Sequence, residues 1–346
     1  MNTLSARLGI EHAVIQAPMA GSQGSRLAIA TCQAGGLGSL PCAMLGLDAM
    51  RSEIAAIRSA TAAPYNVNFF CHADPLPDAA REQAWRDALA PWYAEFGITP
   101  DPSKSGPARR PFSHAIADAL EDLRPPVVSF HFGLPPDDLL ERVRGWGSLI
   151  LSSATTVAEA RWLESRGVDA VIAQGLEAGG HRGMFLVDDV TTQLGTMALL
   201  PQLVASVGVP VIAAGGIVDA SSASAALQLG ATAVQAGTAY LCCPEADTSK
   251  VHRAALASAA AGHTALTNLF SGRPARGIVN RLMRELGPLS DLPPAFPLAT
   301  GAIAPLRAAA EQRGSGDFSP LWAGQNASRC RAIGAAEVTR ELAQGL

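Results

Sequence analysis

The chain has 346 residues, of which 48% are apolar, 16% are charged and 5% are aromatic, and its formal net charge is −4. This composition supplies a substantial hydrophobic core and excludes global disorder. Because it contains no basic block and few aromatic residues, it also argues against nucleic acid as a partner.

Several features bear on where the protein works. No long apolar run follows Arg7, so we expect no signal peptide. The most apolar stretch, residues 201–243, is broken by Gly208, Pro210 and Gln228 and does not supply the ~20 uninterrupted apolar residues of a spanning helix. The six cysteines show neither CxxC spacing nor metal-site spacing to a histidine, which indicates reduced thiols and no metal site. We therefore expect a soluble, cytoplasmic protein with no membrane partner.

Eight short apolar runs recur along the chain with helical patterns between them. In chain order they span residues 14–19, 36–41, 65–70, 127–133, 148–154, 170–175, 209–216 and 233–241. Runs this apolar are typical of strands buried on both faces of a parallel sheet. Their alternation with helices predicts an α/β fold, a (β/α)8 barrel of the TIM type. A doubly wound open sheet is the alternative, and the count of eight favours the barrel.

The helical patterns carry recognisable ends. The segments 155–167 and 219–230 both end in glycine, a common helix stop, and Thr155 and Thr156 are candidate N-caps of the first. Residues 71–126 do not fit the repeat, and we expect a helix near 78–96 and an irregular loop at 98–112. Residues 244–318 follow the eighth strand and hold helical patterns at 251–262, 276–286 and 301–312.

These patterns predict three parts. Residues 1–243 form the barrel, and residues 244–318 form a small helical domain that is inserted between strand eight and the last helix. Residues 319–346 complete the barrel with a helix near 326–345. The insertion is expected above the C-terminal mouth of the barrel, where the active sites of such folds lie.

Glycines follow the last two strands. Gly215 and Gly216 end strand seven, and Gly237 lies next to Thr238 in strand eight. The loops at these positions of a barrel often bind phosphate, because glycine lets backbone N–H groups approach an anion. Either pair alone is equally consistent with tight turns that bind nothing. Two such pairs on consecutive strands favour a phosphate site.

Other residues at strand ends suit a flat aromatic ligand. The first strand ends in Ala17, Pro18 and Met19, which offer backbone groups and an apolar surface. Asn68 and Gln174 are amides near the ends of strands three and six, and the polar edge of an isoalloxazine ring needs such donors and acceptors. The alternative is that these amides satisfy loop backbone.

Two histidines follow strands on the expected catalytic side. His181 lies in QGLEAGGHRG (174–183), where Gly179 and Gly180 allow positive φ and a close approach to a ligand. Histidine is the usual residue for proton transfer near neutral pH, whereas the bland alternative is an exposed loop histidine. His131 ends the run SFHFG, either as a wall of the pocket or as a hydrogen-bonded core residue. GxSxG, Walker A, HExxH and a strand-linked GxGxxG do not occur.

Seven motifs together resemble the class I nitronate monooxygenases, a flavin family formerly called 2-nitropropane dioxygenase. They are QAPM (16–19), YNVNFF (65–70), SFHFG (129–133), AQGLEAGGHRG (173–183), AAGGI (213–217), QAGTAYL (235–241) and FSPLWAGQ (318–325). The resemblance covers nearly the whole chain in the same order. The central motifs also occur in other FMN barrels, including a flavin enoyl-acyl-carrier reductase, whereas FSPLWAGQ is more particular to class I.

The resemblance implies a TIM-type barrel with non-covalent FMN that oxidises alkyl nitronates, among them propionate 3-nitronate, with O2 to carbonyl compounds and nitrite. His181 would be the catalytic histidine, and His131 would help to form the substrate pocket. The residues implied to contact FMN or its phosphate are Asn68, Gln174, Gly179, Gly216, Gln235, Ala236, Gly237 and Thr238. The class I pocket often holds several tyrosines, while this chain has only Tyr65, Tyr93 and Tyr240.

Two other functions stay open at this point. An NAD(P)H-dependent FMN reductase that acts on enoyl thioesters or quinones would share the barrel and the histidine loop. A barrel that binds a phosphate ligand without catalysis would share the glycine pairs. The sequence leaves the oligomeric state and the physiological substrate open, and with them the turnover of neutral nitroalkanes.

Overall fold

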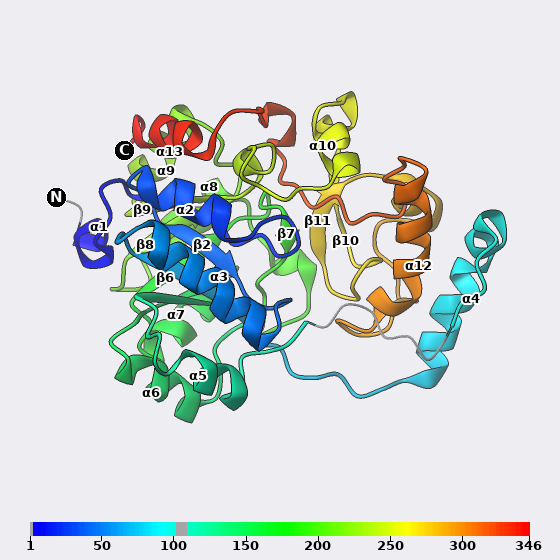
Figure 1. Ribbon diagram of the computed structural model, residues 1–346, viewed down its shortest axis with the longest axis horizontal. Helices are drawn as coiled ribbons and strands as arrows, with labels where there is room; N and C mark the ends of the chain where they lie inside the picture. Colours follow the sequence, from blue (N-terminus) through cyan, green and yellow to red (C-terminus); the bar gives the residue numbers. More distant parts are fainter. Residues whose placement is uncertain (1–2, 102–108) are drawn as a thin grey trace.

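A closed parallel barrel forms the larger part of the molecule, in a computed structural model that describes residues 3–101 and 109–346 (Figure 1). Its eight strands are paired in parallel in the order β1-β9-β8-β6-β5-β4-β3-β2. They are β1 (Val14–Gln16), β2 (Gly38–Pro41), β3 (Tyr65–Phe70), β4 (Val127–His131), β5 (Leu149–Ala154), β6 (Ala170–Gln174), β8 (Val211–Ala214) and β9 (Ala233–Ala236). A parallel bridge between Ile15 and Leu37 joins the two ends of this order. The predicted barrel is confirmed, and the open sheet is wrong.

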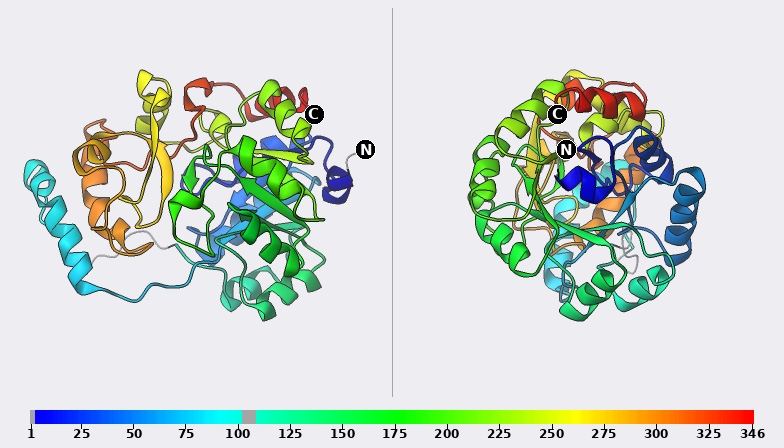
Figure 2. Two further views of the ribbon diagram at one scale, coloured as in Figure 1. Left: turned by 180° about the vertical axis from the view of Figure 1, so that it is seen from behind. Right: turned by 90° about the vertical axis from the view of Figure 1, so that its left-hand side faces the viewer.

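Helices surround the strands, as the view along the barrel shows (Figure 2, right). They are α2 (Ser25–Gln33), α3 (Leu47–Ala60), α5 (His114–Leu120), α6 (Asp137–Gly145), α7 (Val157–Ser165), α8 (Thr196–Val204), α9 (Ala220–Gln228) and α13 (Ala335–Ala343). A short helix, α1 (Thr3–Leu8), places Leu4 and Leu8 in an apolar cluster with Ile15 and Ile172 of the strands. This cluster fills the end of the barrel where the strands begin, so a ligand has to approach from the other end.

Two predicted helix ends can be compared with the structure. The side chain of Thr156 accepts a hydrogen bond from the backbone N–H of Glu159, which confirms Thr156 as the N-cap of α7. The last helix is shorter than expected. It begins at Ala335, because a 3-10 turn, η4 (Ala327–Arg329), and an extended segment come before it.

A second lobe lies beside the C-terminal ends of the strands (Figure 2, left). It contains α4 (Ala79–Phe96), α10 (Lys250–Leu256), η3 (Ala259–Gly262), β10 (Thr264–Thr267), β11 (Ala275–Ile278), α11 (Arg281–Leu286) and α12 (Ala299–Gln312). The expectation of a purely helical insertion is wrong, because β10 and β11 pair as an antiparallel hairpin. The pattern 276–286 predicted one helix, but its first residues belong to the buried strand β11 and only α11 is helical. Part of the loop expected at 98–112 lies outside the described residues.

Two distant segments of the chain share the core of this lobe. The indole of Trp85 in α4 donates to the carbonyl of Ala299 (3.2 Å), and the hydroxyl of Tyr93 donates to the carbonyl of Ala302 (2.6 Å). Buried Trp85 and Leu89 belong to the same apolar cluster as Leu306 of α12. We propose that α4 and residues 250–318 form one structural unit, since neither segment buries its apolar face alone.

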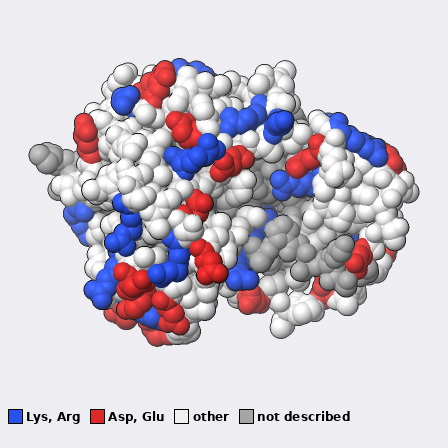
Figure 3. Space-filling view, in the orientation of Figure 1, with Lys and Arg blue, Asp and Glu red and all other residues white. Residues whose placement is uncertain are grey.

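Charges on one face of the molecule are mixed in sign (Figure 3). Acidic side chains gather over α5 and α6, where Arg142 pairs with Asp118 and Glu121, both at 2.7 Å. This corner therefore balances much of its own charge. None of the described helices is long and apolar enough to cross a membrane.

Candidate active site

A cavity lies where the barrel strands end. It is lined by all but one of the residues that the sequence predicted for the site: Ala17, Pro18, Met19, Asn68, His131, Gln174, Gly179, Gly180, His181, Gly215, Gly216, Gln235, Gly237 and Thr238. The exception is Ala236, which is buried in the core behind β9. Successive side chains of a strand point to opposite faces, so Gln235 and Gly237 face the cavity and Ala236 faces the surrounding helices.

Several lining residues were not predicted. Among them are Phe70, Arg109, Glu177, Trp322 and Asn326. Trp322 belongs to the quoted motif FSPLWAGQ, which could have pointed to it, whereas Arg109 lies in a segment without any motif. None of the three tyrosines, all within the described ranges, lines the cavity.

His181 is held through both its backbone and its ring. It belongs to β7 (Gly180–His181), a two-residue strand that pairs antiparallel with β11 of the second lobe. Its carbonyl accepts hydrogen bonds from Nε2 of Gln174 (2.9 Å) and Nε2 of His131 (3.1 Å). Its Nε2 lies 2.8 Å from Oγ of Ser271, which also comes from the second lobe. The imidazole is therefore fixed between the barrel and the lobe.

The glycines before His181 have structural reasons of their own. A Cβ on Gly179 would lie 2.6 Å from backbone atoms of Ala323 and Gly324, so only glycine allows that close packing. Gly180 has a φ of +73°, in the left-handed region that favours glycine, and a Cβ there would meet nothing within 4 Å. The sequence suggested that these glycines allow a ligand to approach. In the structure, Gly179 allows close packing against residues 323–324, and Gly180 adopts the positive φ of the turn.

A buried arginine supports the same turn from behind. Arg182 is fully buried and donates to the carbonyls of Gly175 (2.7 Å) and Gln174 (2.6 Å) and to Oε1 of Gln193 (3.0 Å). Burial lowers the pKa of this guanidinium to about 10, which leaves it charged at neutral pH. The charge-assisted bonds to two carbonyls tie the end of β6 to the residue after His181.

His131 can be assigned a tautomer from its partners. Because the carbonyl of His181 only accepts, Nε2 of His131 carries a proton, and Nδ1 then accepts from the hydroxyl of Ser153 at 3.0 Å. Burial lowers the pKa of His131 to about 4, so the ring is neutral at pH 7. His131 lines the cavity and also orients the backbone of His181, which combines the two roles that the sequence left open.

His181 is also a neutral imidazole. Burial lowers its pKa well below 6.5, and the positive charges of Arg109 and Arg273 lower it further. A neutral imidazole has a free lone pair that can accept a proton, although a lowered pKa also makes the ring a weaker base than an exposed histidine.

The two amides serve the backbone as well as the cavity. Gln174 donates to the carbonyl of His181 and accepts from the N–H of Gly183 at 2.7 Å. Nδ2 of Asn68 donates to Oγ (2.9 Å) and to the carbonyl (3.2 Å) of Ser129 in β4. The alternative that these amides satisfy loop backbone therefore describes Gln174, whereas Asn68 contacts strand backbone. Both amides also line the cavity.

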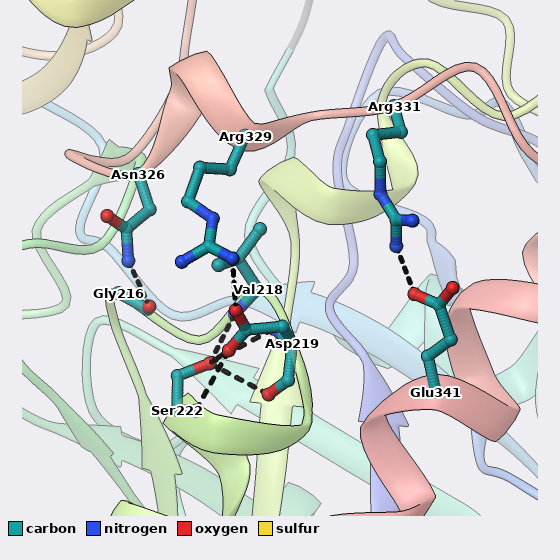
Figure 4. A network of polar contacts seen from close by, with 8 residues as sticks. All are labelled: Gly216, Val218, Asp219, Ser222, Asn326, Arg329, Arg331 and Glu341. Atoms are coloured by element: carbon teal, nitrogen blue, oxygen red, sulfur yellow. Dashed lines mark hydrogen bonds and ion pairs between the residues drawn. The ribbon is translucent and has the colours of Figure 1, made fainter.

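One C-terminal segment contacts both glycine loops. Nδ2 of Asn326 donates to the carbonyl of Gly216 at 2.6 Å (Figure 4). The N–H of Gly324 donates to Oγ1 of Thr238 at 3.0 Å. Arg329 pairs with Asp219 at 2.5 Å, and Asp219 in turn caps α9. The segment 324–329 thus fixes the relative positions of the loops that follow β8 and β9.

Comparison with known proteins identifies the family. A model of the nitronate monooxygenase family matches residues 2–345. The chain belongs to the nitronate monooxygenase family. The predicted family and the prediction of a monooxygenase enzyme are confirmed.

In the described ranges, no group of three or more His, Cys, Asp and Glu is placed to hold a metal ion.

Individual known proteins match the chain almost end to end. A nitronate monooxygenase from Pseudomonas aeruginosa is 43% identical over 342 residues, which cover 98% of this chain and 97% of that protein. The crystal structure of a nitroalkane oxidase from Streptomyces ansochromogenes has a TM-score of 0.89 at 38% identity, with coverage of 98% and 96%. FabK from Thermotoga maritima has a TM-score of 0.70 at 25% identity, with coverage of 99% and 94%.

Proposed function

We propose that this chain is an FMN-dependent monooxygenase that oxidises alkyl nitronates with O2 to carbonyl compounds and nitrite. The observation that carries the proposal is the neutral imidazole of His181, which lines the same cavity as the two glycine loops. The names of the relatives support a nitronate or nitroalkane as the small-molecule substrate.

The bare backbone at the glycine loops fits the phosphate of FMN. A Cβ on Gly237 would lie no closer than 3.4 Å to any neighbour, the Cβ of Ala17, and a Cβ on Gly216 would lie no closer than 3.7 Å. Both glycines line the cavity, where their backbone N–H groups would bind an anion. The hydroxyl of Thr238 adds a donor beside them.

The remaining lining residues fit the rest of the cofactor. Ala17, Pro18 and Met19 offer a flat, mostly apolar contact, while Asn68 and Gln174 offer polar groups. FMN would supply the redox chemistry when it is bound, and the protein would orient the substrate. These assignments are proposals that rest on the lining and on the family resemblance.

His181 would act on the proton of the substrate. With a neutral nitroalkane, its imidazole would accept the proton α to the nitro group. A nitronate has already lost that proton, so His181 would then orient the anion. Phe70 and Trp322, whose rings lie 6.4 and 5.4 Å from that of His181, would limit water around the reacting carbon.

Oxygen uptake tests the proposed function. The purified protein should show the absorbance of bound flavin, and propionate 3-nitronate should cause O2 uptake with equivalent formation of nitrite. A colourless protein that takes up no FMN would instead favour the phosphate-binding barrel without catalysis.

We also propose a cytoplasmic location, based on the cysteine pattern.

The similarity to FabK keeps an NAD(P)H-dependent FMN reductase as the second candidate. Anaerobic mixing separates the two functions. Bleaching of the bound flavin by NADH or NADPH would favour the reductase, whereas bleaching by a nitronate and not by a nicotinamide would favour the monooxygenase.

A further inference from the structure

Arg109 places a positive charge on the cavity wall, and none of the described carboxylates forms an ion pair with it. Of the described lining residues, only Arg109 and Glu177 carry a full charge. The carboxylate of Glu177 already accepts from the backbone N–H (2.8 Å) and the hydroxyl (2.7 Å) of Thr196. Within residues 3–101 and 109–346, no Asp or Glu forms an ion pair with Arg109, and residues 102–108 contain no acid.

The guanidinium of Arg109 is positioned by the second lobe. Its Nη1 donates to Oγ1 of Thr300 at 3.0 Å, and its central carbon lies 5.9 Å from the ring centroid of Phe296. Burial lowers the pKa of Arg109, and the positive charge of Arg307 lowers it further. Among the described residues, only one of its five N–H donors has a hydrogen-bond partner, which leaves donors for an anion.

Arg109 also lies near the proposed base. Phe296 contacts both residues, since its ring centroid is 5.2 Å from that of His181. After burial, the charge of Arg109 is the largest influence that keeps His181 neutral. An elongated substrate could therefore have its reacting carbon at His181 and a second charged group at Arg109.

We propose that Arg109 binds a carboxylate at the end of the substrate away from the nitronate carbon, so that the cavity selects nitronates that carry a second anionic group. A carboxylate matches the planar fork of one guanidinium, which binds it through two parallel N–H···O bonds. The hydroxyl of Thr300 accepts from Arg109 and donates to the carbonyl of Phe270 (3.2 Å), so it orients the guanidinium. This assignment rests on the proposed function for the reacting end of the substrate.

Two nitronates of matched shape test the assignment on the FMN-loaded enzyme. Propyl-1-nitronate has a methyl group where propionate 3-nitronate has its carboxylate. The wild type should prefer propionate 3-nitronate in kcat/KM by at least about tenfold, the scale of a hydrogen bond to a charged group, and should lose this preference as salt is added. Equal kcat/KM values for the two substrates would overturn the proposal without any variant.

Arg109→Gln should remove the preference. We expect kcat/KM for propionate 3-nitronate to fall about 10- to 100-fold, as for loss of a charge-assisted hydrogen bond, and that for propyl-1-nitronate to change less than about threefold. Arg109→Lys should recover part of the loss, because it keeps the charge without the fork. Arg110→Gln is the matched control, since Arg110 is the exposed neighbour and does not line the cavity. Equal losses with both substrates would overturn the assignment.

Succinate separates this proposal from the proposed function. It has the length of propionate 3-nitronate with a carboxylate in place of the nitronate, and it does not react. Calorimetry should show weaker binding of succinate to Arg109→Gln than to the wild type or to Arg110→Gln. If the wild type oxidises no nitronate, the proposed function fails, and weaker succinate binding would still support the carboxylate site. Unchanged succinate affinity in Arg109→Gln would overturn it.

Discussion

The hydroxyl of Ser271 lies 2.8 Å from Nε2 of His181 and 3.3 Å from the carbonyl oxygen of Arg273. Because a carbonyl only accepts, the hydroxyl donates to Arg273 and accepts from Nε2–H of His181. This arrangement leaves the lone pair of the neutral imidazole on Nδ1. Ser271 is therefore a positioning residue, which sets the tautomer of His181.

Ser271→Ala should lower kcat/KM for neutral nitroalkanes about 2- to 10-fold, which corresponds to loss of one ordinary hydrogen bond. The bond from Nε2–H is stronger when the imidazole is protonated, so its loss should also move the acid limb of the pH profile to lower pH. Ser271→Thr should restore both values. A fall in activity without any change of the pH profile would indicate that Ser271 only packs against the ring.

His181→Asn should leave FMN bound and should lower kcat/KM for neutral nitroalkanes by ~10² to 10⁴, the usual contribution of general base catalysis. Turnover of the preformed nitronate should fall less, because its α-proton is already gone. The ratio of the two losses is the diagnostic value, and equal losses would mean that His181 only orients the substrate. His263→Asn is a suitable control, since His263 is exposed and outside the cavity.

Gly237→Val should weaken FMN binding severely, because its side chain would fill the space that we assign to the phosphate. A Cβ at this position would lie 3.4 Å from its nearest protein atom, an ordinary contact, so the fold itself should accept the first carbon. Flavin content and the Kd of FMN measure the effect, with Gly237→Ala expected in between. Gly262→Val is the control, since a Cβ at Gly262 meets nothing within 4 Å. Wild-type flavin content in a folded Gly237→Val would remove the phosphate assignment.

Phe296→Ala should change substrate preference more than flavin affinity. Phe296 lies in the second lobe and contacts the ring of His181, so its truncation should enlarge the space beside the reacting carbon. We expect kcat/KM to rise for nitronates with a branched carbon relative to unbranched ones, with the Kd of FMN changed less than about threefold, since no proposed FMN contact is removed. A large loss of FMN with an unchanged preference would contradict this role of the lobe.

Acid should destabilise the fold through buried neutral histidines. Burial lowers the pKa of His131 and of His252 to about 4, from 6.5. Below pH 6.5 these histidines bind protons in the unfolded chain but stay neutral in the folded state. The free energy of unfolding should therefore fall as the pH drops from 6.5 to about 4. Thermal melts of the FMN-loaded protein across this range measure the slope. His252→Gln, away from the cavity, should reduce the slope, and an unchanged slope would contradict the assignment.

The sequence by itself determined the barrel and a large part of the cavity wall. Eight apolar runs are a local signal, because strands buried on both faces must be apolar along their whole length. The residues at the C-terminal ends of barrel strands meet at one end of the barrel. The sequence alone therefore predicted that Asn68, Gln174 and Gly237 lie close together. The motif order then pointed to the family.

Only the tertiary structure decided what surrounds His181. Ser271 and Arg109 carry no local pattern. Ser271 reaches the ring of His181 because β11 pairs with β7, and Arg109 lines the cavity, where Thr300 of α12 holds it. The placement of α4 against α12 likewise depends on contacts between residues more than 200 positions apart, such as that of Trp85 with Ala299. Periodicity within one segment describes only that segment's own burial. The partner that covers it depends on packing over the whole chain, which is why the barrel and single helices of the lobe could be predicted and the arrangement of the lobe could not.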